Sequence, residues 1–155
     1  NVGPGPDPFS LSALPDDVSF VVIFFQRDFY CTNCRSQVQS VADRVDDFHD
    51  RDAEVVSVLP EPRERAAEWQ SNYDLPYPLL ADPEASVSDS YDQPVRFGIL
   101  GRFSDFFGRM PEVVIVDRRG SVPQIAYVNQ GRSTFDRPEI DDLLAELDDL
   151  RVESE

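Results

Sequence analysis

Apolar residues gather along the chain in four short runs that have the composition of β-strands. The first run, residues 18–25 (VSFVVIFF), is almost wholly apolar, β-branched and aromatic, as in a strand buried on both faces of a sheet. A second run covers residues 53–59, and two more, 112–117 and 123–129, are separated by a short turn-like stretch. The pattern predicts two early strands and a late strand pair.

Between these runs, apolar residues recur at the spacing of a helix. A helix is predicted over residues 33–50, and its inner face consists of Val38, Val41, Val45 and Phe48. Pro62 is predicted to lie in the first turn of a helix that ends near residue 72, and a short helix is expected over residues 83–91. Asp136 and Glu139 have the spacing of a capping box at the start of the last helix. The apolar stripe of that helix is Ile140, Leu143, Leu144, Leu147 and Leu150.

This order of elements predicts an α/β protein with a thioredoxin-like fold: a central mixed β-sheet flanked by helices on both faces. The first strands should pair in parallel through right-handed crossovers, and the last two should be antiparallel. A length of 155 residues suits one domain. Residues 1–8 contain three prolines and two glycines, so we expect a loose arm that lies against the body, and we expect residues 151–155 to form a loose tail.

The net charge of the chain argues against some classes of binding partner. There are 30 Asp and Glu residues against 14 Lys and Arg, none of them Lys, and the net charge is −16. Such a field repels phosphate backbones, which argues against nucleic acid and anionic membranes as ligands. It also destabilises the compact state unless salt screens it. We therefore hypothesise that the protein works in a very salty cytoplasm, as haloarchaeal proteins do.

The sequence offers no targeting or membrane signal that would change this expectation. It contains no apolar run of the roughly 18 residues that a membrane-spanning helix needs. Its first residues lack the basic and then apolar pattern of a secretory signal, although a start at Asn1 leaves a removed leader open. We expect a cytoplasmic protein.

The two cysteines, Cys31 and Cys34, are the most informative residues in the chain. They lie just after a predicted buried strand and at the start of a predicted helix, where the helix dipole and unpaired N–H groups lower a thiol pKa. One helical turn separates them, so both sulfurs can close into a small, reversible disulfide. With His49 they make only three soft metal ligands, which argues against zinc, and no cofactor is implied. Two inert, buried thiols are the alternative.

Four segments, in order, resemble the redoxin branch of the thioredoxin superfamily, which includes alkyl hydroperoxide reductases and peroxiredoxins (AhpC/TSA type). These segments are residues 6–11 (PDPFSL), 25–35 (FQRDFYCTNCR), 75–84 (LPYPLLADPE) and 110–117 (MPEVVIVD). The resemblance implies that Cys31 is the attacking thiol and Cys34 the resolving one. It also implies that Pro111 is a cis-proline beside the dithiol. Tyr30 and Arg35, which flank the pair, are the expected supporting residues.

The same resemblance leaves three functions open. The first is a thiol–disulfide oxidoreductase that uses a disulfide substrate and a thiol electron donor, such as a thioredoxin, a reductase or a small thiol. The second is a peroxiredoxin-like peroxidase, in which Cys34 or Cys31 forms a sulfenic acid that the other cysteine resolves. If Cys34 takes the peroxidatic position, Cys31 and Arg27 stand where such enzymes have the threonine and proline of their peroxide-binding motif. The third is a thioredoxin-fold binding module without catalysis. The oligomeric state, monomer or homodimer, also stays open.

Overall fold

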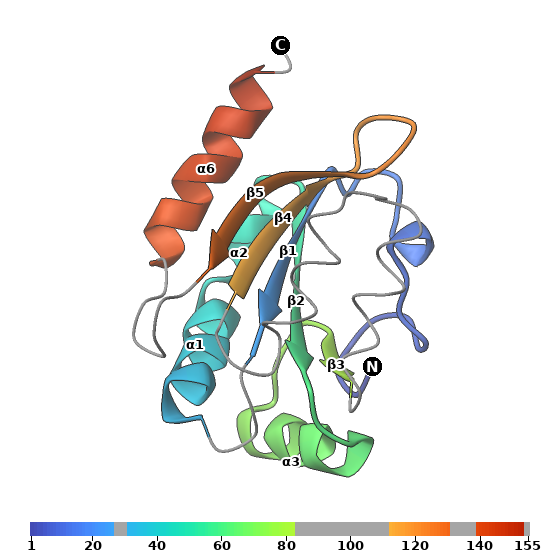
Figure 1. Ribbon diagram of the computed structural model, residues 1–155, viewed down its shortest axis with the longest axis vertical. Coiled ribbons are helices and arrows are strands. Elements are labelled where there is room, and N and C mark those ends of the chain that lie inside the picture. Colours follow the sequence, from blue (N-terminus) through green and yellow to red (C-terminus); the bar gives the residue numbers. More distant parts are fainter. Residues whose placement is uncertain (27–30, 83–111, 131–138, 154–155) are drawn as a thin grey trace.

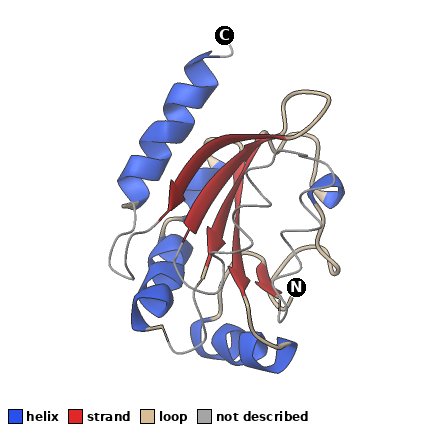
Figure 2. Cartoon of the chain, in the orientation of Figure 1, coloured by secondary structure: helices blue, strands red, loops and turns tan. Residues whose placement is uncertain are grey.

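A five-stranded mixed β-sheet forms the centre of the molecule (Figure 1, Figure 2). The computed structural model describes residues 1–26, 31–82, 112–130 and 139–153. The strand order is β3-β2-β1-β4-β5. Pairs β1–β2 and β2–β3 are parallel, whereas β1–β4 and β4–β5 are antiparallel. The strands are β1 (Phe20–Phe25), β2 (Ala53–Leu59), β3 (Leu79–Ala81), β4 (Glu112–Asp117) and β5 (Gln124–Gln130).

The two faces of the sheet are covered differently. Residues 20, 22 and 24 of β1 point to one face, where they pack against residues of α1 (Thr32–Asp43), α2 (Val45–His49), α3 (Arg63–Tyr73) and α6 (Ile140–Glu153). The alternate residues of β1 point to the other face, where the segment around the 3-10 helix η1 (Leu11–Ala13) covers them. Every residue of β1 is buried, as its continuous apolar run predicts.

The predicted architecture is confirmed, including the parallel start and the antiparallel end of the sheet. Strands β2 and β4 have the predicted bounds, 53–59 and 112–117. Strand β3 was not predicted, because three apolar residues show no alternation and are recognised as a strand only by their pairing with β2. The helix expected at 83–91 and the capping residue Asp136 lie outside the described residues.

Two helix predictions need correction. The helix expected over 33–50 is divided at Arg44, whose φ of −116° and ψ of 13° leave the helical region. The Arg44 side chain reaches Asp47 in α2 and Asp141 in α6. Pro62 precedes α3 and does not lie in its first turn, because its ψ of 155° is extended.

Residues 1–3, at the start of the chain, lie against β3 and the segment before it. The N–H of Val2 donates to the carbonyl of Leu79 at 2.9 Å, and the N–H of Leu79 donates to Asn1 Oδ1 at 3.2 Å. Gly3 lies so close to the segment that precedes β3 that a Cβ on this glycine would be 2.5 Å from the Tyr77 carbonyl oxygen. At the other end, α6 continues to Glu153. None of the helices in the described ranges is long and apolar enough to cross a membrane.

Candidate functional site

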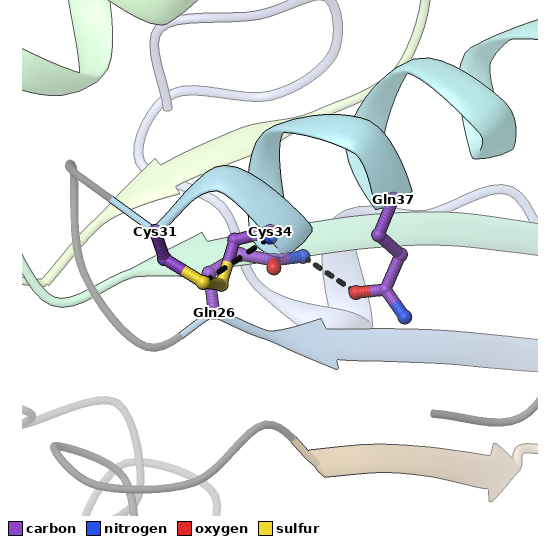
Figure 3. Close-up of a disulfide and its surroundings, with 4 residues drawn as sticks. All are labelled: Gln26, Cys31, Cys34 and Gln37. Atoms are coloured by element: carbon purple, nitrogen blue, oxygen red, sulfur yellow. Dashed lines mark hydrogen bonds between the residues drawn. A yellow bond between two sulfur atoms is a disulfide. The ribbon is translucent and has the colours of Figure 1, made fainter. Parts of the chain in front are cut away.

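Cys31 and Cys34 form a disulfide at the N-terminus of α1 (Figure 3). Their Cα atoms are 5.2 Å apart, within the usual range for a disulfide. Cys31 is the N-cap residue, and its Sγ accepts a hydrogen bond of 3.2 Å from the N–H of Cys34. The first turn of the helix therefore directs a backbone donor at one sulfur, which is the arrangement that stabilises a thiolate after reduction.

The two cysteines differ in their exposure to solvent. Cys31 keeps 9% of its surface exposed, whereas Cys34 is fully buried in the main core together with Val38 and Val41 of the same helix. Of the two cysteines, Cys31 is therefore the one that retains some surface toward solvent.

Gln26 lies next to the disulfide, and the sequence predicted no role for it (Figure 3). It continues the alternation of Phe20, Val22 and Phe24 past the end of β1, on the face where α1 packs, and its backbone N–H donates to Val58 O at 2.8 Å. Its side chain is 1% exposed, and its Nε2 donates to Gln37 Oε1 at 3.2 Å. The available signal was a polar residue at a position where the alternation calls for an apolar one.

A second polar group, behind the site, holds α1 on the sheet. The hydroxyl of Tyr77 donates to the carbonyl of Val38 in α1 at 3.2 Å and accepts from Ser57 Oγ of β2 at 3.1 Å. Tyr77 is completely buried, and this burial raises the pKa of its phenol far above the usual value. Tyr77 belongs to the segment 75–84 that resembles the redoxins, but its side chain had no predicted role.

The other predicted site residues are placed as follows. Arg35 is half-buried in the first turn of α1, and its backbone N–H donates to the carbonyl of Cys31 at 3.1 Å. Tyr30 and Pro111 lie outside the described residues. His49 lies at the end of α2, where its Nε2 is 3.2 Å from Glu54 Oε1. The cysteines lie at the opposite end of the α1–α2 pair, at the start of α1.

Comparison with known proteins agrees with the predicted family and fold. The family model of the AhpC/TSA family matches residues 5–125. Peroxiredoxin Bcp of Bacillus subtilis (strain 168) is 21% identical over 101 residues, which are 65% of this chain and 63% of that protein. The matched part thus spans less than two thirds of that relative.

Solved structures of peroxiredoxins have the same fold. The reduced 2-Cys peroxiredoxin of Plasmodium vivax has a TM-score of 0.68 and 16% identity, covering 89% of this chain and 80% of that one. A yeast mitochondrial 1-Cys peroxiredoxin, described as resolved via glutathione/thioredoxin systems, has a TM-score of 0.67 and 17% identity, covering 87% and 65%. Because the family model covers most of the chain, this protein belongs to the AhpC/TSA family.

Proposed function

We propose that this protein is a thiol–disulfide oxidoreductase that acts through Cys31 and Cys34. The observation that carries the proposal is the disulfide at the N-terminus of α1, with Cys31 9% exposed and Cys34 fully buried. A short ring of this kind constrains the unfolded chain little, so it suits a reversible bond better than a structural one. Membership of the AhpC/TSA family supports thiol chemistry as well.

The proposed cycle assigns each sulfur one role. The thiolate of Cys31 attacks a substrate disulfide and forms a mixed disulfide, while the leaving sulfur takes a proton. Cys34 loses its proton and attacks Cys31 Sγ, which releases the second substrate thiol and forms the Cys31–Cys34 disulfide. Two thiol equivalents from a donor then reduce this disulfide. A small thiol or a thioredoxin-type protein would serve as donor, and the cytoplasm, which supplies both, is the compartment that we propose.

Three residues are proposed to support the dithiol. Arg35 adds positive charge near the first turn of α1, where its backbone is already bonded to the carbonyl of Cys31. Tyr30 and Pro111 are proposed from their match to the redoxin motifs, as the flanking aromatic residue and as the proline that presents backbone to the substrate.

Single-cysteine variants test this assignment. With insulin as substrate and dithiothreitol as donor, Cys31→Ser should lose essentially all of the catalysed reduction, measured as turbidity. When the reduced Cys34→Ser protein is mixed with insulin after dithiothreitol has been removed, it should accumulate a mixed disulfide with the substrate, detected by mass spectrometry, because no second thiol resolves it. Full turnover in the Cys31→Ser protein would refute the proposed role of Cys31.

Peroxide reduction is the second candidate, because the similar proteins are peroxiredoxins. A cysteine thiolate would attack the peroxide, the O–O bond would break, and an alcohol or water would leave. The resulting sulfenic acid would then condense with the other thiol to give the disulfide and water. The same two variants identify the attacking sulfur, since only the one that keeps it forms a sulfenic acid with hydrogen peroxide. Oxidation no faster than that of free cysteine would reject this candidate.

A further inference from the structure

Gln26 carries a buried oxygen that has no partner among the described residues in the disulfide form of the protein. Its backbone N–H and its Nε2 are both hydrogen-bonded, to Val58 O and to Gln37 Oε1. Its Oε1 is buried and accepts no hydrogen bond from the part of the chain that the structure describes. An unsatisfied carbonyl in an apolar core is costly, so a native structure that retains one calls for an explanation.

The position of Gln26 relates this oxygen to the dithiol. The residue lies beside the disulfide, and its amide is tied to Gln37, one turn after Cys34 on the same helix (Figure 3). That hydrogen bond fixes the amide against the turn of α1 that carries the buried sulfur. Cys34 has no exposed surface, so its sulfur has little access to water as an alternative partner.

Reduction supplies the donor that the oxidised form lacks. The disulfide reacts with two glutathione molecules to give two protein thiols and oxidised glutathione, so each protein sulfur gains a hydrogen when both are protonated. A disulfide sulfur has no proton to donate, whereas a thiol is a weak donor. We propose that Gln26 Oε1 accepts a hydrogen bond from the Cys34 thiol in the reduced protein, and that it thereby shifts the dithiol–disulfide equilibrium toward the dithiol.

The same contact separates the roles of the two sulfurs. An acceptor that bonds to a neutral S–H favours the protonated form, so Gln26 holds the proton on Cys34. The backbone N–H of Cys34 points at Cys31 Sγ and favours a thiolate there. Gln26 is thus a residue that tunes the dithiol, and the inference rests on the proposed redox cycle.

A redox titration with a matched control tests the inference. Gln26→Met keeps the length of the side chain and removes the acceptor. Gln70→Met is the control, because Gln70 on α3 also has a buried Oε1 without a partner in the described ranges, and its Nε2 is bonded to the carbonyl of Leu75. In glutathione buffers, Gln26→Met should lower the equilibrium constant for reduction about fivefold, which is about 20 mV for a two-electron couple. Gln70→Met should leave it unchanged.

The outcomes separate this inference from the function on which it rests. If the unmutated dithiol does not cycle in glutathione buffers, the proposed function is wrong. If the dithiol cycles but the two glutamine variants shift the equilibrium equally, or Gln26→Met has no effect, the inference about Gln26 is wrong.

A spectroscopic measurement does not depend on how Gln26→Met folds. In Cys31→Ser, Cys34 is the only thiol, so its S–H stretching band can be observed by Raman spectroscopy. The inference predicts a band at lower frequency than that of an unbonded thiol, and a band at the unbonded frequency would overturn it.

Discussion

At the scale of single residues, the polar side chains around the disulfide join segments that are distant in sequence. Cys31 and Cys34 have a spacing and a position, before a helix, that are visible in the chain itself. The structural roles of Gln26 and Tyr77 depend on contacts between segments distant in sequence, since Tyr77 forms hydrogen bonds with residues 20 and 39 positions away. A polar residue at the end of a strand otherwise resembles the start of a loop.

Tyr77 provides a test at this scale. Tyr77→Phe removes the hydroxyl that joins α1 to β2, and it leaves Ser57 Oγ without that partner. We expect a loss of about 1–2 kcal/mol in the free energy of unfolding, measured by urea denaturation at neutral pH. Tyr73→Phe, in α3, is the control for the loss of a tyrosine hydroxyl and should change stability little.

The pKa of Tyr77 adds a dependence on pH to that test. Burial raises this pKa in the folded protein, so the phenol stays neutral there while it ionises in the unfolded chain. The buried phenol contributes fully to the free energy of unfolding below the pKa of tyrosine in the unfolded chain, about 10, and this contribution declines as the pH rises above that value. Tyr77→Phe should therefore show a shallower loss of stability at alkaline pH than the unmutated protein. Equal slopes would contradict the burial of this phenol.

At the scale of elements, predictions succeeded where the pattern was long and failed at boundaries set by local backbone geometry. The buried strands β1, β2 and β4 and the helix α6 were recognisable from composition and period. The division between α1 and α2 at Arg44 leaves the apolar stripe intact, because Val38, Val41 and Phe48 stay buried on both sides of it. The pattern of apolar residues therefore could not reveal it.

The end of α3 shows such a boundary and offers a test. Asp74, the C-cap residue, has a φ of 48° and a ψ of 55°, in the left-handed region. Glycine adopts this region without steric cost, and a negative charge is unfavourable at a helix C-terminus. Asp74→Gly should raise the free energy of unfolding by about 0.5–1 kcal/mol.

A charge control separates the two causes at Asp74. Asp74→Asn removes the carboxylate and retains a side chain that tolerates the left-handed region. In thermal or urea denaturation, it should recover only part of the gain of Asp74→Gly. If Asp74→Gly is destabilising, the conformational argument fails.

At the scale of the whole molecule, the acidic surface is the dominant feature. Ion pairs between Arg51 and Asp148 and between Arg44 and Asp141, each at 2.9 Å, join α6 to the α1–α2 region. These pairs are partly exposed, and such pairs contribute little to stability. They cannot offset the repulsion of a net charge of −16.

Salt should therefore stabilise the protein. The Debye length falls from about 10 Å at 0.1 M to about 3 Å at 1 M, so molar KCl screens most of the repulsion between surface carboxylates. We expect the melting temperature to rise with KCl over this range, measured by circular dichroism. An uncharged osmolyte at equal osmolality is the control. A melting temperature that does not respond to KCl would remove the hypothesis of a salt-adapted protein.

The N-terminal arm has a consequence for how molecules of this protein meet one another. The free backbone groups of an outermost strand are a template on which a second chain can add, and this is a common route to aggregation. In β3 the outward N–H and C=O of Leu79 are already occupied, by Asn1 Oδ1 and by the N–H of Val2. The arm thus protects this edge of the sheet, and a second chain can add to β3 only after the first residues of the arm detach from Leu79.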